Sequence, residues 1–214
     1  MTLRIVDVSV APVWRGPTGS ARDDRVTEVL AGEPVLTTGA RSDGRVAVVV
    51  PWQPSPLDDA GYPGWVAEAD LGNEVEASPS LTVDPSVLAH DSDDPVDLAR
   101  HLLGTPYVWG GLSPHGIDCS GLVHLVHRTL GRVVPRDARD QAAALPSVPL
   151  DAVRRGDLYF FARPDRPAHH VGFVVEPGVM LHASDGDGGV VEGALDPGRS
   201  ETLVSAGRIA VDLR

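Results

Sequence analysis

Residues 105–126, TPYVWGGLSPHGIDCSGLVHLV, contain the single cysteine of this 214-residue chain, Cys119. A lone thiol forms no intramolecular disulfide and no multi-cysteine metal site, which leaves an inert buried cysteine or a nucleophile. A loop rich in glycine and proline precedes it, and residues 120–130 have apolar side chains at helical spacing up to Gly131. Cys119 is therefore expected in the first turn of a helix, where unpaired backbone N–H groups stabilise a thiolate and lower the thiol pKa.

Two downstream histidines are candidates for the group that takes the thiol proton. His170 opens a β-like run, and His182 lies in the run that returns after a turn at residues 176–178. In an antiparallel hairpin the two side chains lie near-symmetrically about the turn and can meet on one face. One imidazole is then the base and the other its orienter. Because His169 directly precedes His170, a register one residue away would give it the role of base.

Seven short motifs follow one another along the second half of the chain: Tyr107-Val108-Trp109-Gly110-Gly111, Ser113-Pro114, Asp118-Cys119-Ser120-Gly121, Pro135-Arg136-Asp137, Gly156-Asp157-Leu158, His170-Val171-Gly172 and His182-Ala183-Ser184. In this order they resemble the NlpC-type family of papain-like cysteine peptidases, which cut bacterial cell-wall peptides. The resemblance covers about residues 95–214 and implies that Cys119 is the nucleophile, His170 the general base and His182 the orienting third member. Ile117 departs from it, since the family usually has an aromatic residue there.

The same resemblance implies a set of substrate-binding residues. In the family, residues matching Tyr107, Asp118 and Ser120 bind the free amino group of an N-terminal L-alanine, and a carboxylate facing an ammonium is a sensible pairing. Asp118 would serve equally well as the N-cap of the cysteine helix. Trp109 either lines the cleft or packs under its loop. Tyr62 either lines the groove or belongs to the core of a preceding domain.

The first seventy-odd residues predict a small all-β domain. Short β-like runs alternate with turn signals such as Ser42-Asp43-Gly44. Their spacing, together with the string Gly61-Tyr62-Pro63-Gly64-Trp65-Val66, resembles a bacterial SH3-like barrel. The expected strands are Leu3–Val10, Val26–Leu30, Glu33–Thr38, Arg45–Val50 and a last one beginning at Gly61.

The sequence therefore predicts three parts: an SH3-like barrel at 1–75, an acidic, proline-broken linker at 76–94 and a peptidase domain at 95–214. The peptidase domain is expected to be α+β and papain-like, with helices packed on an antiparallel sheet. Its expected helices are 96–103, 120–130 and 136–144, and its expected strands are 157–161, 170–175, 179–183, 189–192 and 208–212.

The composition of the chain limits the classes of molecule that it is expected to bind. The formal net charge is −12, and all eighteen basic residues are arginine, which disfavours nucleic acid and anionic membrane as partners. The N-terminus shows no signal-peptide pattern, so a cytoplasmic location is expected, with export as the alternative. No cofactor or metal is expected, although Cys119, His170 and His182 could instead be three zinc ligands. Four other histidines are expected to be solvated: His101, His115, His124 and His127.

These observations predict a cysteine endopeptidase acting on short murein peptides. The resemblance implies hydrolysis of the bond between γ-D-glutamate and a diamino acid in peptides with a free N-terminal L-alanine, in peptidoglycan recycling. One alternative is a peptidase or amidase that acts on intact peptidoglycan. A second, from a different class, is a wall-peptide binding module without activity.

Overall fold

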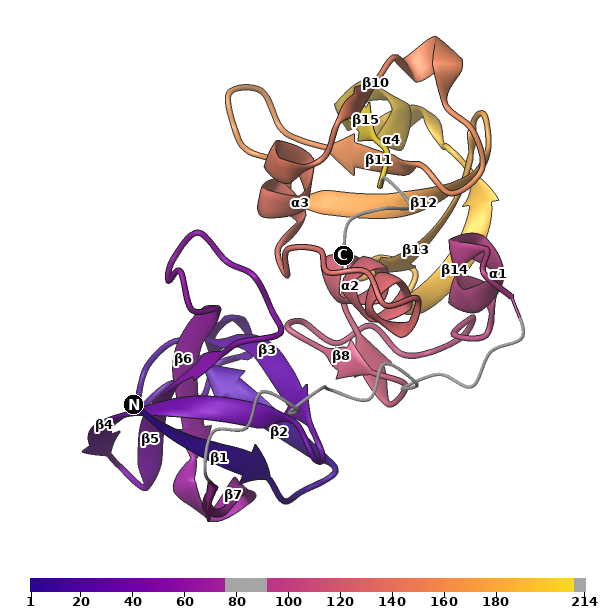
Figure 1. Ribbon diagram of the computed structural model, residues 1–214. Helices are drawn as coiled ribbons and strands as arrows, with labels where there is room; N and C mark the ends of the chain where they lie inside the picture. Colours follow the sequence, from indigo (N-terminus) through magenta and orange to yellow (C-terminus); the bar gives the residue numbers. More distant parts are fainter. Residues whose placement is uncertain (76–91, 210–214) are drawn as a thin grey trace. The chain divides into compact units, whose positions relative to one another are not determined.

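The computed structural model describes residues 1–75 and 92–209. Contacts divide the chain into two compact units, Met1–Asp84 with Trp109–Ser113, and Pro85–Val108 with Pro114–Arg214 (Figure 1). Most of the predicted linker, at 76–91, lies outside the described residues. The predicted domain boundaries stay a prediction, and the segment 109–113 makes its contacts within the first unit.

The first unit contains one antiparallel seven-stranded sheet in the order β3-β2-β6-β5-β4-β1-β7. Its core is built largely from valines, as expected of the small SH3-like barrel that the sequence predicts. The predicted strand 3–10 is interrupted: β1 ends at Val6, and a second strand, β2, begins at Val10. The strand that starts at Tyr62 is followed by one more strand. The bounds are β1 Thr2–Val6, β2 Val10–Trp14, β3 Arg25–Leu30, β4 Pro34–Ser42, β5 Arg45–Val50, β6 Tyr62–Ala67 and β7 Leu71–Val75, with short 3-10 turns at Arg22–Asp24 and Glu68–Asp70.

The glycine-rich segment before the cysteine is fastened to β3. The Arg25 side chain donates from Nε to the carbonyl oxygen of Trp109 over 2.9 Å. The Glu28 carboxylate accepts from the backbone N–H of Leu112 over 2.8 Å. Gly110 has a φ of +71°, and a Cβ there would lie 2.8 Å from the carbonyl oxygen of Arg25. The Trp109-Gly110-Gly111 motif therefore needs glycine for close backbone approach.

The second unit has a six-stranded antiparallel sheet in the order β10-β15-β11-β12-β13-β14. Helix α2 packs against β12 and β13, and α1 and α3 pack against α2, which gives the predicted α+β arrangement (Figure 1). The helices are α1 Pro95–Arg100, α2 Cys119–Thr129, α3 Ala138–Ala144 and α4 Pro197–Thr202, with a 3-10 turn at Leu150–Ala152. The strands are β8 Leu112–Ser113 (first unit), β9 Gly116–Ile117, β10 Ser147–Val148, β11 Leu158–Phe161, β12 His170–Glu176, β13 Val179–Ser184, β14 Gly189–Ala194 and β15 Leu203–Gly207.

The C-terminal segment differs from the sequence prediction. The predicted strand 208–212 is wrong for its described part, because the pairing partner of β11 is β15 at Leu203–Gly207. Residues 210–212 of that prediction lie outside the described residues. The helix α4 was not predicted, although Asp196 followed by Pro197 is a typical N-cap and first-turn pair.

Helix α2 is buried along its whole length, which overturns the expectation of solvated histidines on it. His124 and His127 are each 1% exposed, because neighbouring elements cover both faces of the helix. His124 Nδ1 lies 2.9 Å from the carbonyl oxygen of Val134, and the His127 ring packs on Phe173 at 5.6 Å between centroids. Burial lowers the pKa of each imidazole to about 3.

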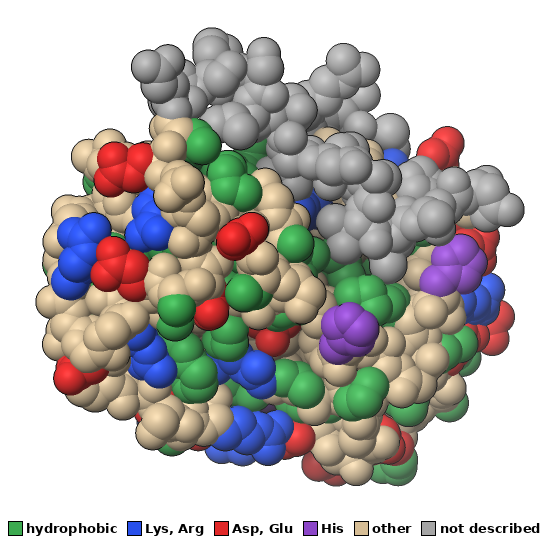
Figure 2. Space-filling view, turned by 90° about the horizontal axis from the view of Figure 1, so that it is seen from below, with side chains coloured by type: hydrophobic (Ala, Val, Ile, Leu, Met, Phe, Trp, Pro, Cys, Tyr) green, Lys and Arg blue, Asp and Glu red, His purple; other side chains and the backbone are tan. Residues whose placement is uncertain are grey.

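The surface is mixed in charge. On the face seen in Figure 2, arginine side chains lie among aspartate and glutamate side chains. Among residues 1–75 and 92–209, no helix combines the length and apolar character needed to cross a membrane.

The buried histidines predict acid-sensitive stability. A histidine whose pKa is lower in the folded state than in the unfolded state binds its proton on unfolding, so stability falls as pH drops below about 6.5. Between pH 7.5 and 5 we expect a loss of about 2 kcal/mol in the free energy of unfolding for each such histidine. His127→Leu should remove about that much of the fall, measured by urea denaturation at both pH values. The exposed His101, changed to Gln, is the matched control, and an equal effect of both variants would contradict the assignment.

Candidate active site

Cys119 is the first residue of α2, as the sequence predicts. Asp118 is the N-cap, and its Oδ1 accepts from the backbone N–H of Gly121 over 2.6 Å. The Cys119 side chain is only 6% exposed. The cap fixes the direction in which the helix leaves the loop, and with it the position of the thiol.

Arg136 is a neighbour of Asp118 for which the sequence predicted no role. Its guanidinium, 1% exposed, grips the Asp118 carboxylate with both terminal nitrogens, Nη2 to Oδ2 at 2.8 Å and Nη1 to Oδ1 at 3.0 Å. Nη1 also donates to the Ser120 hydroxyl over 3.0 Å. The only signal in the sequence was the Pro135-Arg136-Asp137 motif, since a pairing across 18 residues leaves no local pattern. Asp118 therefore already faces one cation.

The thiol is held in its protonated form. Burial raises the pKa of Cys119 to about 12, and the Asp118 carboxylate adds to the rise. Backbone hydrogen bonds from Val171 and Ser120 and the charge of Arg136 act in the opposite direction. The prediction that the helix start lowers the thiol pKa is therefore wrong in its net sign. A helix terminus contributes about 0.3–1 kcal/mol, which is less than the cost of burying a thiolate.

The structure brings His170 and His182 together. Strands β12 and β13 pair with Phe173 opposite Leu181, and continuing that register puts both histidines on one face, two residues apart diagonally. His170 Nε2 lies 2.9 Å from His182 Nδ1, and the rings meet edge to face at 4.9 Å. Val171, whose backbone bonds the Cys119 thiol, directly follows His170. The thiol and the histidine pair are thus joined through the start of β12.

Gly172 makes the histidine contact possible. It lies on the same face as His170 and opposite His182 in the β12–β13 register. A Cβ at this position would lie 2.8 Å from the Cβ of His182 and 3.1 Å from the carbonyl oxygen of Leu181. The glycine of the His170-Val171-Gly172 motif therefore leaves the space in which the two imidazoles meet.

Both imidazoles are uncharged at neutral pH. Burial lowers the pKa of His170 to about 3, and His182 and Arg199 contribute to the decrease. Burial also lowers the pKa of His182 to about 4, followed by the charge of Arg199. Because Cys119 is protonated as well, these shifts favour a neutral thiol and imidazole over a resting ion pair.

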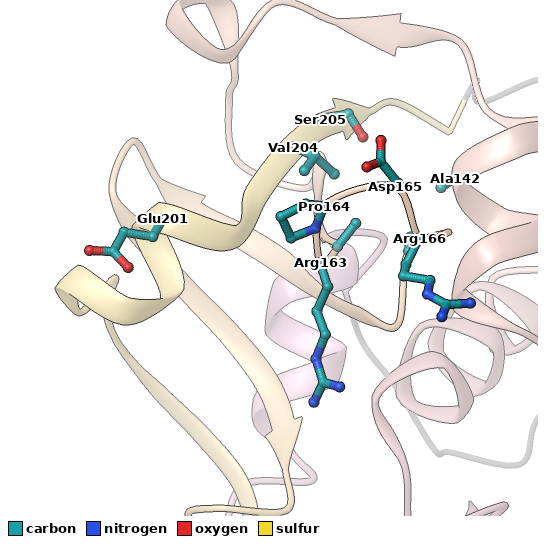
Figure 3. Close-up of a pocket in the computed structure, with 10 residues that line it drawn as sticks. Ala142, Arg163, Pro164, Asp165, Arg166, Glu201, Val204 and Ser205 are labelled. Carbon is teal, nitrogen blue, oxygen red and sulfur yellow. The ribbon is translucent and has the colours of Figure 1, made fainter.

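His169 lies apart from this pair. It is exposed, its backbone N–H donates to the carbonyl oxygen of Phe161, and burial followed by Arg163 lowers its pKa. The preceding loop lines a hollow of about 350 Å³, from which the side chains of Arg163 and Arg166 extend (Figure 3). The contact with His182 belongs to His170, which supports the register predicted from the sequence.

The remaining predicted residues have different environments. Tyr107 is half-buried and bridges to Ile117, the residue before Asp118. Trp109 is 42% exposed. Tyr62 is 5% exposed within the valine-rich core of the barrel, the alternative that the sequence left open. The described residues hold no group of three or more His, Cys, Asp or Glu placed to bind a metal ion.

Comparison with known proteins shows the family of this chain. The model of the NlpC/P60 family matches residues 104–208. The chain is 33% identical over 213 residues to a γ-D-glutamyl-L-lysine dipeptidyl-peptidase of Bacillus subtilis (strain 168), covering 73% of this chain and 71% of the relative. The chain belongs to the NlpC/P60 family.

Two further relatives of this NlpC/P60 protein extend over both units. A Bacillus cereus protein, also named γ-D-glutamyl-L-lysine dipeptidyl-peptidase, is 26% identical over 85% of this chain and 78% of its own length. The crystal structure of an NlpC/P60 family protein from Bacillus cereus ATCC 10987 superposes with a TM-score of 0.83 at 22% identity. It covers 97% of this chain and 99% of that one. The two-part fold is therefore shared.

The space at Gly172 predicts a sharp effect of a single methyl group. Gly172→Ala should push the His182 side chain away from His170 and lower kcat/KM by about 10- to 100-fold, because small displacements of catalytic groups are costly. Gly193→Ala is the matched control, since it is also a sheet glycine and its Cβ would meet nothing within 4 Å. Equal activity of the two variants would show that the histidine contact tolerates the methyl group.

Proposed function

We propose that this NlpC/P60 protein hydrolyses the bond between γ-D-glutamate and the diamino acid of short cell-wall peptides. Its family makes it a cysteine peptidase, and two relatives bear the name γ-D-glutamyl-L-lysine dipeptidyl-peptidase. The observation that carries the proposal is the 2.9 Å contact between His170 Nε2 and His182 Nδ1. It leaves His170 Nδ1 as the ring nitrogen that can take the proton of Cys119.

The proposed mechanism starts from the neutral pair. His170 carries its proton on Nε2 and donates it to His182 Nδ1, so His170 Nδ1 is a free base. It removes the Cys119 proton as the sulfur attacks the γ-carbonyl, and the backbone N–H of Cys119 stabilises the oxyanion. His170 then protonates the leaving amine of the diamino acid. Water hydrolyses the thioester, and no metal or cofactor takes part.

We also propose that the substrate carries a free N-terminal L-alanine and comes from peptidoglycan recycling. Asp118, Ser120 and Tyr107 would bind its ammonium group. Support comes from the fixed orientation of the Asp118 carboxylate, which the α2 backbone and Arg136 hold in place. The ammonium would be the second cation beside this carboxylate, after Arg136. The contributions of Tyr62 and Trp109 rest on the family resemblance.

The catalytic assignment predicts the behaviour of three variants. Cys119→Ala and His170→Ala should abolish hydrolysis of L-Ala-γ-D-Glu-diamino acid tripeptide while the far-UV circular dichroism spectrum is kept. His169→Ala should retain most of the activity, because His169 lies outside the pair. Release of the diamino acid, followed by mass spectrometry, measures all three. Turnover by Cys119→Ala would end the proposal, and reversed phenotypes of the two histidines would move the base to His169.

The amine subsite predicts discrimination against blocked peptides. Acetylation removes the charged hydrogen bond between the substrate ammonium and Asp118, which contributes about 1.5–3 kcal/mol, or about 10- to 150-fold in kcat/KM. Tyr62→Phe, which keeps the ring in the barrel core, tests the phenol hydroxyl separately. The measurement compares kcat/KM for free and N-acetylated tripeptide. Equal values would instead favour action on intact, cross-linked peptidoglycan.

A further inference from the structure

The helix that the sequence did not predict brings a cation to the histidine pair. Arg199 lies in α4, and its Nη2 donates to the Ser184 hydroxyl over 2.9 Å and to Asp187 Oδ2 over 3.1 Å. Its Nε pairs with Asp196 Oδ2 at 3.3 Å, and its backbone N–H binds the same cap residue. The guanidinium, 26% exposed, is therefore held from three sides.

The remaining nitrogen of this guanidinium points at the base. Arg199 Nη1 lies 3.5 Å from His170 Nε2, the same atom that meets His182 Nδ1. A guanidinium has only donors and keeps its charge at every pH of interest. It therefore tolerates a neutral imidazole beside it and opposes an imidazolium.

We propose that Arg199 is a positioning residue of the histidine pair: its charge, 3.5 Å from His170 Nε2, adds to burial in disfavouring a proton on His170 and His182 and so shifts the acidic limit of activity to lower pH. The inference rests on the proposed function, in which this pair performs the proton transfers. A neutral His170 stays available as a base at lower pH, and once protonated it is a stronger acid toward the leaving amine.

Several other groups around His170 also influence its protonation, and His182 does so more strongly than Arg199. His182 on β13 and His169, just before β12, both disfavour a proton on His170, as Arg199 does, while Asp118 before α2 favours one. Asp187 favours a proton on His182. Arg199 differs from the histidines because its charge does not change with pH, so it acts on His170 at every point of the titration.

Titration of the imidazole by NMR tests this directly. In a Cys119→Ala background, Arg199→Gln should raise the midpoint of His170 by about one pH unit, whereas Arg199→Lys should keep most of the wild-type value. Asp187→Asn, a change at an exposed carboxylate, should lower the midpoint of His182. Arg41→Gln, which breaks an ion pair with Glu68 in the barrel, is the control of equal charge change. Unchanged midpoints in both Arg199→Gln and Asp187→Asn would overturn the proposal.

The pH profile of kcat/KM on the tripeptide is the second measurement. In the active enzyme, Arg199→Gln should move the acidic limb to higher pH by the same amount as the NMR midpoint. A decrease of equal size at every pH, with the limb in place, would mean a merely structural role and would overturn the proposal. The NMR experiment needs no turnover, so failure of the proposed peptidase reaction and failure of the Arg199 assignment give different results.

Discussion

The buried pair of Asp118 and Arg136 is the interaction on which the site depends. One carboxylate caps α2 through Gly121, binds Arg136 at two points and thereby orients Ser120. Removing one partner of a buried pair leaves an uncompensated charge and typically costs about 3–5 kcal/mol. The start of α2, and with it the thiol, is therefore held by a contact that admits little adjustment.

Near this ion pair, the three groups of the proposed mechanism, Cys119, His170 and His182, are uncharged at rest. Burial raises the pKa of Cys119 and lowers the pKa values of His170 and His182. The thiol and both imidazoles are therefore neutral at pH 7. Charge then appears only as the proton moves, next to groups that are already oriented. Fixed donors in such an environment stabilise developing charge more than they would in water.

The sequence predicted those parts of the site that have local signatures. The start of α2 at Cys119 and the β12–β13 hairpin follow from spacing and turn residues, whereas the choice of His170 over His169 came from the family resemblance and stays a prediction. Partners that are distant in the sequence left no such pattern. Arg136 reaches Asp118, and Arg199 reaches His170, only through tertiary packing.

The errors have the same origin. A helix with two histidines three residues apart was expected to expose them, since a helix normally has a polar face. Helix α2 is covered on all sides, so His124 and His127 became core residues. Similarly, the last strand was expected at 208–212, whereas β11 pairs with Leu203–Gly207.

Acid should therefore inactivate this enzyme by two separable routes. In the proposed mechanism, protonation of His170 is local and removes the base while the fold remains. Protonation of His124 and His127 needs the helix to open, because both are buried in the core of the catalytic unit, and it shifts the folding equilibrium instead. The proposed effect of Arg199 is on His170. Arg199 is not among the charges that lower the pKa of His124 or His127. By the same linkage, a change at Arg199 that raises the pKa of His170 would reduce the acid-induced loss of stability that comes from His170 and leave the parts that come from His124 and His127.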